Sequence, residues 1–347
     1  MDFSIAGILL LDGANNGAIY ALLALAIVLV FAITRVILVP QGEFAAYGAL
    51  TLAMLQLGRV PGTVWLLVVL ALVVAMLDGV DMLRRRRGAA RAALAFLRPL
   101  AWPLPVVLFS LWAAPRHLPL VVQSLLALAI VTPLGPLLYR VAYEKVADAS
   151  VLVLLIVSVG VHFAMTGLGL AFFGAEGFRN PSFWDADFSA GPLMLSGQTV
   201  IIFMVSIALM LGLWLFFGRT LRGTAMRATA MNRLGARLMG ISTVEAGRLS
   251  FTLAAFIGAL AGLLIAPTTT MAYDTGFLIG LKGFVAAIFG GLASYPGAAL
   301  GALFVGLLES FGSFWASAFK EVIVFTLILP VLLWRSSRHD APDEEGE

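Results

Sequence analysis

The chain has 347 residues, of which 61% are hydrophobic and only 12% are charged, and its net charge is +3. A typical soluble domain is about 45–50% apolar and about 25% charged, so a compact soluble particle could not hide this much apolar surface from water. The composition therefore excludes a soluble enzyme, a nucleic-acid binder, a coiled coil and a disordered chain. It predicts an all-α, polytopic transmembrane helical bundle.

A helix that crosses the bilayer needs about 20 largely apolar residues. This length predicts membrane helices near residues 14–33, 62–80, 99–114, 118–138, 150–173, 199–217, 249–270 and 319–334. Three shorter pieces rich in Gly and Ala, near 42–57, 278–293 and 297–314, are full spans, half-helices or re-entrant segments. We therefore expect about 9–11 membrane segments, some short or broken, in one domain over residues 1–335.

Lysine and arginine favour cytoplasmic loops of membrane proteins, so their distribution predicts orientation. The predicted loops alternate between two sets, of which one contains seventeen basic residues and the other four. Lys282 lies inside an apolar segment and belongs to neither set. This bias predicts an N-terminus outside the cell and a C-terminus in the cytoplasm. The polar and acidic residues 336–347 are expected to form a disordered cytoplasmic tail.

The rare residue types exclude several chemistries. The chain has no cysteine and three histidines, with no metal-binding pattern among them. None of its three lysines follows the glycine-rich pattern of a phosphate-binding loop. We therefore expect no catalytic residue, no metal, no cofactor and no ATP hydrolysis by that route. His162, alone in an apolar segment, is expected to be packed and hydrogen-bonded rather than a proton relay.

Residues 219–248 form a long internal loop with helical character. Between its arginines the loop places small residues and methionines at helical spacing, namely Ala225, Met226, Ala228, Met231, Leu234, Leu238 and Met239. The arginines alone would anchor the loop to anionic lipid headgroups. The small, methionine-bearing face instead favours docking to a cytoplasmic partner, because a short helix with such a face can bind in a groove.

Polar residues also occur at membrane depth. They are Asn15, Asn16, Tyr20, Gln41, Glu43, Lys282 and Glu309. One interpretation places Glu43 and Lys282 at the membrane interfaces, where lysine snorkels and glutamate caps a helix. In the other, broken helix ends at 41–44 and 280–284 line a translocation route, since half-helix N-termini suit a substrate carboxylate.

Glycines four residues apart mark close helix contacts. Gly258 with Gly262 and Gly297 with Gly301 have this spacing. In lipid, faces of small residues let helix backbones approach closely. Such faces pack either within the chain or against a second subunit.

Four segments of the chain resemble one family of membrane proteins, in order along the sequence. They are NNGAIYALLALAIVLVFAITRVILVPQGEFAAYGAL with its polar QGEF junction (15–50), LLYRVAYEKVADASVLVLLIVSVGV (137–161), GTAMRATAMNRLGARLMGIS (223–242) and KGFVAAIFGGLASYPGAALGALFVGLLES (282–310). Together they are similar to the membrane permease of branched-chain amino-acid ABC importers. The main departure is at residues 81–118, where an arginine-rich stretch and an apolar segment look like an insertion.

This resemblance implies a function. A permease of this family is the membrane-spanning subunit of an ATP-binding-cassette importer, and it would translocate branched-chain or related small amino acids inward. The implied partners are two cytoplasmic ATPase subunits, a second homologous permease, a periplasmic substrate-binding protein and the lipid bilayer, with no nucleic acid. The implied location is the bacterial inner membrane.

The resemblance also implies roles for individual residues. Docking on the ATPase subunits within loop 219–248 is expected at Arg222, Gly223, Arg227, Asn232, Ala236, Met239 and Gly240. Gly223 and Gly240 are expected to terminate the docking helix, since glycine tolerates left-handed backbone angles. The translocation pathway is expected at Asn15, Asn16, Tyr20, Gln41, Gly42, Glu43, Lys282 and Gly283.

Two other functions compete with this one. A secondary transporter of a small solute, driven by an ion gradient, would need buried charged pairs as ion sites. Glu43, Lys282 and Glu309 are the few candidates for such sites. An intramembrane enzyme would need paired aspartates, a metal cluster or a serine nucleophile motif, and the sequence contains none of these patterns.

Overall fold

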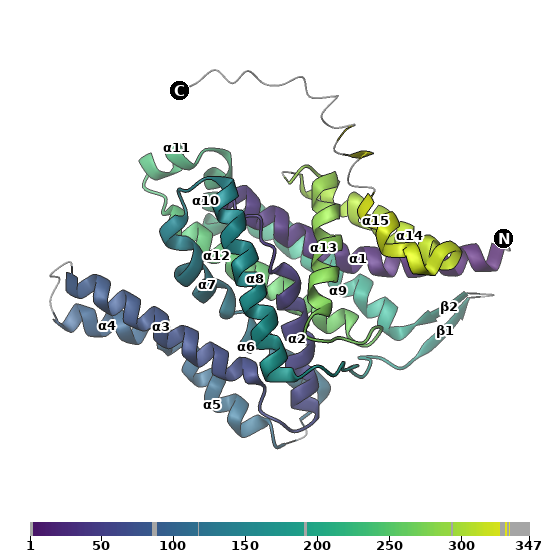
Figure 1. Cartoon of the computed structure of the whole chain (residues 1–347), viewed down its shortest axis with the longest axis horizontal. Coiled ribbons are helices and arrows are strands. Elements are labelled where there is room, and N and C mark those ends of the chain that lie inside the picture. Colours follow the sequence, from purple (N-terminus) through teal and green to yellow (C-terminus); the bar gives the residue numbers. More distant parts are fainter. Residues whose placement is uncertain are drawn as a thin grey trace.

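The computed structural model describes residues 3–84, 89–116, 118–190, 193–292, 294–326, 330, 331 and 333. Within these residues, eight helical stretches are long and apolar enough to cross a membrane. The shorter helices α2 (Gln41–Gln56) and α13 (Thr275–Phe289) lie among them, and the sheet in the described residues is a two-stranded hairpin. The predicted all-α, multi-spanning bundle is confirmed (Figure 1).

The other elements follow in chain order. The first are α1 (Phe3–Thr34), α3 (Gly62–Arg84), α4 (Ala89–Ala101), α5 (Pro103–Ala113), α6 (Leu120–Val131) and α7 (Leu134–Leu138). Next come the π-helical turn η1 (Tyr139–Tyr143), the 3₁₀ turn η2 (Glu144–Val146), α8 (Val151–Phe173), β1 (Asp187–Ala190), β2 (Leu193–Ser196) and α9 (Gly197–Arg219). The last are α10 (Leu221–Met231), α11 (Arg233–Leu238), α12 (Thr243–Ile265), α14 (Tyr295–Ala316), the 3₁₀ turn η3 (Ser317–Phe319) and α15 (Lys320–Thr326).

Prolines explain two differences from the predicted segments. The short piece near 297–314 is a full 22-residue helix, α14. Pro296 lies in its first turn, where a backbone N–H has no acceptor within the helix, so proline costs no hydrogen bond there. The predicted span near 99–114 falls within an apolar helical stretch, Ala93–Ala113, that is long enough to cross a membrane. A turn at Trp102, between Pro99 inside α4 and Pro103 at the start of α5, interrupts this stretch. Proline removes a helical hydrogen bond and crowds the preceding turn, which accounts for the interruption.

Both ends of the chain also differ from the predicted spans. The first helix begins at Phe3 rather than near residue 14, and its early turns pack on α14. Within the predicted span 319–334, residues 320–326 form α15, which packs back against α14 instead of extending it. The predicted tail at 336–347 lies outside the described residues.

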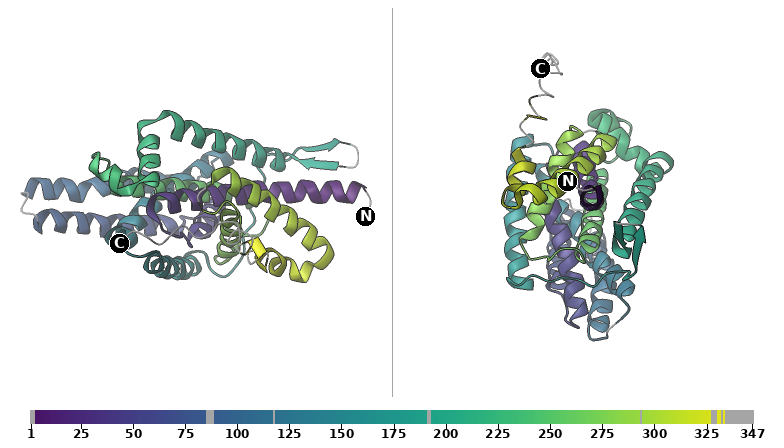
Figure 2. Two further views of the ribbon diagram at one scale, coloured as in Figure 1. Left: turned by 90° about the horizontal axis from the view of Figure 1, so that it is seen from above. Right: turned by 90° about the vertical axis from the view of Figure 1, so that its right-hand side faces the viewer.

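Helix α1 runs through the centre of the bundle and contacts α12, α13 and α14 (Figure 2). Glycines make the crossing with α14 close: a Cβ at Gly306 would lie 2.3 Å from the carbonyl oxygen of Gly13. Helix α2 contacts both α12 and α13, and all of its residues except Gln56 are buried. Gly262 and Gly301 pack against Ala45 and Phe289 of this chain, so these glycine faces serve packing within the chain.

The arginine-rich loops meet on one face of the bundle. Arg140 in η1 donates to Asp78 at 2.5 Å and to Asp81 at 2.8 Å, near the end of α3. It also donates to Glu144 at 2.6 Å, and Glu144 accepts from Arg248 of α12 at 2.9 Å. We call the surface formed by the end of α3, residues 139–148 and residues 219–248 the arginine-rich face.

The other set of loops meets away from that face. Gln56 at the end of α2 donates to Gln123 of α6 at 2.6 Å. Phe178, in the loop that leads to β1, forms an antiparallel bridge with Met271, between α12 and α13. Loops that alternate along the sequence therefore separate into two groups in space, as expected when each intervening helix crosses a membrane.

Candidate functional site

A buried charged cluster joins α1, α13, α14 and α15. Lys282 is 5% exposed, and its Nζ lies 2.5 Å from Oε1 of Glu309. Tyr20 donates its hydroxyl to Oε2 of Glu309 at 2.5 Å. Glu321 of α15 adds a second carboxylate, 3.8 Å from Lys282 Nζ. Because buried charges are tolerated when they are paired and hydrogen-bonded, this cluster accounts for a lysine inside an apolar helix.

A second buried pair joins α2 and α8. Oε1 of Glu43 lies 2.6 Å from Nδ1 of His162, and Glu43 is 1% exposed. The imidazole packs on the ring of Phe277 in α13, with 4.6 Å between the ring centres. His162 is therefore packed and hydrogen-bonded, as predicted. Both Glu43 and Lys282 are thus buried within the protein and paired, and their position at the membrane interfaces stays an interpretation.

Glycines hold the start of α2 directly against α13. A Cβ at Gly42 would lie 1.9 Å from the carbonyl oxygen of Gly276, and a Cβ at Gly280 would lie 2.8 Å from Cα of Gly42. Further along α13, a Cβ at Gly283 would lie 2.7 Å from Cβ of Leu23 in α1. Such backbone contact stabilises helix pairs in lipid, because the hydrophobic effect does not drive helices together there and close van der Waals packing does. Helix α13 is thereby fixed against both α1 and α2.

Replacing Gly42 with alanine is expected to lower the stability of the folded protein sharply. The added methyl group meets backbone atoms of α13, so the two helices must separate, and overpacking of this kind typically costs about 1–3 kcal/mol. Gly212→Ala in α9 is the matched control, because no atom lies within 4 Å of its Cβ position. Thermal unfolding in detergent compares the two variants. Equal unfolding midpoints would contradict the close contact between α2 and α13.

The other predicted pathway residues lie around these two pairs. Asn15 is buried in α1 and Asn16 is half-buried. Gln41 donates from Nε2 to the carbonyl oxygen of Ala254 in α12 at 3.0 Å. Among the described residues, Oδ1 of Asn15, Oε1 of Gln41 and Oε2 of Glu43 are buried oxygens without a hydrogen-bond partner. Tyr20 thus belongs to the cluster around Lys282. Gln41 and Glu43 lie near α13, and Asn16 belongs to neither pair.

Two residues that complete the pairs were absent from the predicted pathway. Glu309 neutralises Lys282, and His162 bonds Glu43. A lysine in an apolar segment needs a buried acid, so the sequence contained a signal for Glu309. The contact between His162 and Glu43 spans 119 positions of sequence and had no such signal.

Two short helices, α10 and α11, follow α9 on the arginine-rich face. Thr220 Oγ1 accepts from the backbone N–H of Gly223 at 2.9 Å and starts α10. Asn232 Oδ1 accepts from the backbone N–H of Gly235 at 2.8 Å and starts α11. Gly240 follows α11 with φ of +79°, which confirms its prediction as a terminating glycine.

Of the seven predicted docking residues, five are exposed and two are buried. Gly223 is buried, and a Cβ there would lie 2.1 Å from the carbonyl oxygen of Phe216. It lies in the first turn of α10, so the prediction that Gly223 terminates the helix is wrong; it lets α10 pack on α9. Ala236 is buried in α11. The exposed residues are Arg222, Arg227, Asn232, Met239 and Gly240.

The apolar residues of α10 and α11 divide into a buried and an exposed set. Met226 is 1% exposed and packs with Leu29 and Ile33 of α1, whereas Met231 and Met239 are 88% and 83% exposed. Leu221, Leu234 and Leu238 are also exposed. The predicted single face is therefore corrected: Met226 attaches α10 to the bundle. The other side chains form an exposed apolar surface of the kind that marks interaction sites.

Two contacts join this surface to the residues just before α8. Arg237 donates to Oδ1 of Asp148 at 2.8 Å. Arg233 donates to the carbonyl oxygen of Ala147 at 2.9 Å. Helix α11 therefore connects directly to the residues that precede α8, and α8 carries His162 of the buried pair.

One family profile matches most of the chain. Its description is "Branched-chain amino acid transport system / permease component", and the match covers residues 92–332. The matched range includes 92–118, and the insertion predicted at 81–118 stays a prediction. No solved structure matches the chain significantly.

Curated relatives agree with the profile. The chain is 31% identical to "High-affinity branched-chain amino acid transport system permease protein BraD" of Pseudomonas aeruginosa over 230 residues, 62% of this chain and 74% of the relative. It is 30% identical to the LivH permease protein of Escherichia coli K12 over 214 residues, 60% and 70% of the two chains. It is 30% identical to "Probable branched-chain amino acid transport permease protein LivH" of Methanocaldococcus jannaschii over 227 residues, 64% and 70%.

Proposed function

Because this chain belongs to the branched-chain amino acid transport permease family, we propose that it is the membrane-spanning subunit of an ATP-driven importer. It would move branched-chain or related small amino acids inward without changing them covalently. The observation that carries the proposal is the exposed apolar surface of α10 and α11 on the arginine-rich face. That surface gives separate ATPase subunits a place to bind, and a periplasmic binding protein would deliver the solute to the opposite side.

The orientation that we propose has the arginine-rich face in the cytoplasm and the N-terminus outside. The grouping of Arg140, Arg237 and Arg248 on one face supports it, since basic side chains favour the cytoplasmic side of the bilayer. The location is then the inner membrane of a bacterium. The β1–β2 hairpin belongs to the outer side, where solute arrives.

Residues 219–248 are proposed as the docking segment for two ATPase subunits. Met231 and Met239 form its exposed apolar contact, with Arg222, Arg227, Asn232 and Gly240 beside them and Gly223 and Ala236 shaping the helices from beneath. The ion pair between Arg237 and Asp148 supports transmission of movement, because it connects the segment to the residues just before α8. A push on α11 would thereby reach the helix that bears His162.

The translocation pathway is proposed along α1, α2 and α13. Asn15, Gln41 and Glu43 each keep a buried oxygen without a partner among the described residues, and such acceptors suit the ammonium group of an amino acid. Asn16, Tyr20 and Lys282 extend this polar line, while Gly42 and Gly283 keep the helices close. In this structure Lys282 pairs with Glu309 and Glu43 pairs with His162, which corresponds to a closed route.

Helix α8 is proposed as the contact with a second homologous permease. Leu152, Ile156 and Phe163 are exposed along it. Gly160 and Gly167 have no atom within 4 Å of their Cβ positions, so another helix has room to approach. Because His162 lies on the same helix, such a partner would sit beside the proposed pathway.

Uptake of radiolabelled leucine, isoleucine and valine into proteoliposomes tests this function. The vesicles contain this chain, the second permease and both ATPases, with the binding protein outside and ATP inside. We expect uptake that requires ATP and persists after ionophores collapse all ion gradients. The alternative is a secondary transporter that uses the charged pairs as ion sites, and uptake driven by a proton or sodium gradient without ATP would favour it.

A further inference from the structure

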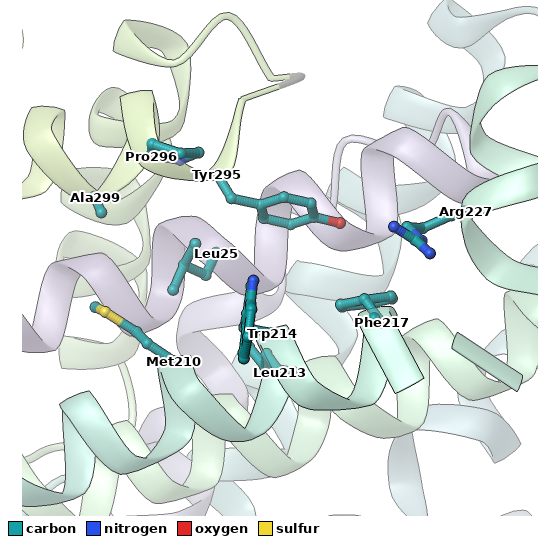
Figure 3. Close-up of a pocket in the computed structure, with 10 residues that line it drawn as sticks. Leu25, Met210, Leu213, Trp214, Phe217, Arg227, Tyr295, Pro296 and Ala299 are labelled. Carbon is teal, nitrogen blue, oxygen red and sulfur yellow. The ribbon is translucent and has the colours of Figure 1, made fainter. Parts of the chain in front are cut away.

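A groove with a volume of about 400 Å³ opens between α9 and α14, beside α1 (Figure 3). Volumes from about 300 to 1,000 Å³ are typical of sites for small ligands. Leu25 of α1 and Met210 and Leu213 of α9 line it, together with residues at the start of α14. The groove is too small to hold a whole phospholipid, but it can accommodate part of one acyl chain.

The two ends of this groove differ in polarity. Leu25, Met210 and Ala299 form an apolar end, whereas Arg227 of α10 closes the other end (Figure 3). The hydroxyl of Tyr295 points toward Arg227, so that end offers a hydroxyl and a guanidinium group (Figure 3). A ligand that fits must be apolar along its length and able to accept hydrogen bonds, with negative charge, at one end.

The arginine at this end of the groove differs from other arginines on the same face in its acidic partners. Arg140, Arg237 and Arg248 on the same face form ion pairs with acidic residues. In the part of the chain that the structure describes, no acidic side chain lies within ion-pair distance of Arg219 or Arg227. Arg227 thus carries a charge that suits an external anion.

We propose that this groove binds an anionic phospholipid, with its phosphate at Arg227 and an acyl chain against Leu25, Met210 and Leu213. Helix α9 is the least buried of the eight candidate spans, so the groove faces the bilayer, which supplies such a ligand. Basic side chains at the cytoplasmic surface attract anionic lipids, and the apolar groove adds a fixed position for the chain. The bound lipid would connect α9, α14 and α10.

Lipid retention by the purified chain tests the proposal without any transport assay. The chain in detergent is titrated with dioleoyl phosphatidylglycerol or dioleoyl phosphatidylcholine, and bound lipid is counted by native mass spectrometry alongside thermal unfolding. We expect Arg227→Gln to lower the affinity for phosphatidylglycerol about fivefold. Arg219→Gln is the matched control, since it removes the same charge outside the groove, and it should keep the wild-type affinity.

A second variant separates the groove from the charge. Ala299→Trp keeps Arg227 but fills the apolar end, and it should also release phosphatidylglycerol. Unchanged phosphatidylglycerol binding in Arg227→Gln would overturn the proposal. Equal losses in Arg219→Gln and Arg227→Gln would also overturn it, since they would indicate diffuse attraction of lipid to basic residues. Equal protection by soluble glycerol phosphate would overturn it as well, since it would indicate a phosphate site without a lipid chain.

Discussion

Replacing Lys282 alone with methionine should remove most of the folded protein and most of the transport activity. The substitution leaves Glu309 buried beside Tyr20 without its cation. Breaking one member of a buried ion pair typically costs about 3–5 kcal/mol, a large share of the total stability of most proteins. The measurements are the thermal unfolding midpoint in detergent and ATP-driven uptake in proteoliposomes. Glu309→Gln should act in the same direction.

The double variant Lys282→Met with Glu309→Gln separates structure from transport. It removes both charges of the buried pair, so most of the lost stability should return, because the carboxylate that remains, on Glu321, is partly exposed to solvent. If uptake returns as well, the pair serves folding alone. If stability returns and uptake does not, the pair belongs to the pathway. Wild-type stability in both single variants would contradict the burial of this pair.

Aspartate at both Met231 and Met239 should abolish ATP-driven uptake while the chain remains folded and inserted. Both side chains are exposed, so the substitution removes no packing within the chain. In a complex, a carboxylate would be buried against an apolar surface of the ATPase, and the loss of one central contact typically weakens binding by about 2 kcal/mol or more. Co-purification of the ATPase subunits measures the effect.

Leucine at the same two positions is the matched control, because it keeps the size and apolar character of methionine and should preserve binding. Met226→Asp makes a poor test of docking, because Met226 is buried against α1 and its replacement should detach α10 from the bundle. Unchanged co-purification of the ATPases with the aspartate variant would show that they bind elsewhere on the chain.

The membrane helices were largely predictable because their length and apolar composition are local properties. Segments near 62–80, 150–173 and 199–217 are the helices α3, α8 and α9. Local backbone chemistry was predictable where one residue decides it, as at Gly240 after α11. The role of Gly223 was not predictable from its own turn. A glycine is required there because α9 packs directly against that position.

The composition of the buried site depended on contacts that sequence spacing does not encode. Lys282 and Glu43 stood out as charges in apolar surroundings, but their partners lie 27 and 119 positions away. The burial of Met226 could not be predicted either. Helical spacing groups Met226 with the other apolar residues of the loop, and only its packing against α1 distinguishes it from them. Tertiary packing therefore decided which polar and apolar residues face one another.

In the function proposed above, this chain conducts the solute and other subunits supply the energy. The most direct measurement is solute uptake by proteoliposomes that contain this chain alone, supplied in turn with internal ATP, a proton gradient and a sodium gradient. We expect no accumulation against a concentration gradient and no ATP hydrolysis under any of these conditions. Uphill accumulation or ATP consumption by the isolated chain would contradict it.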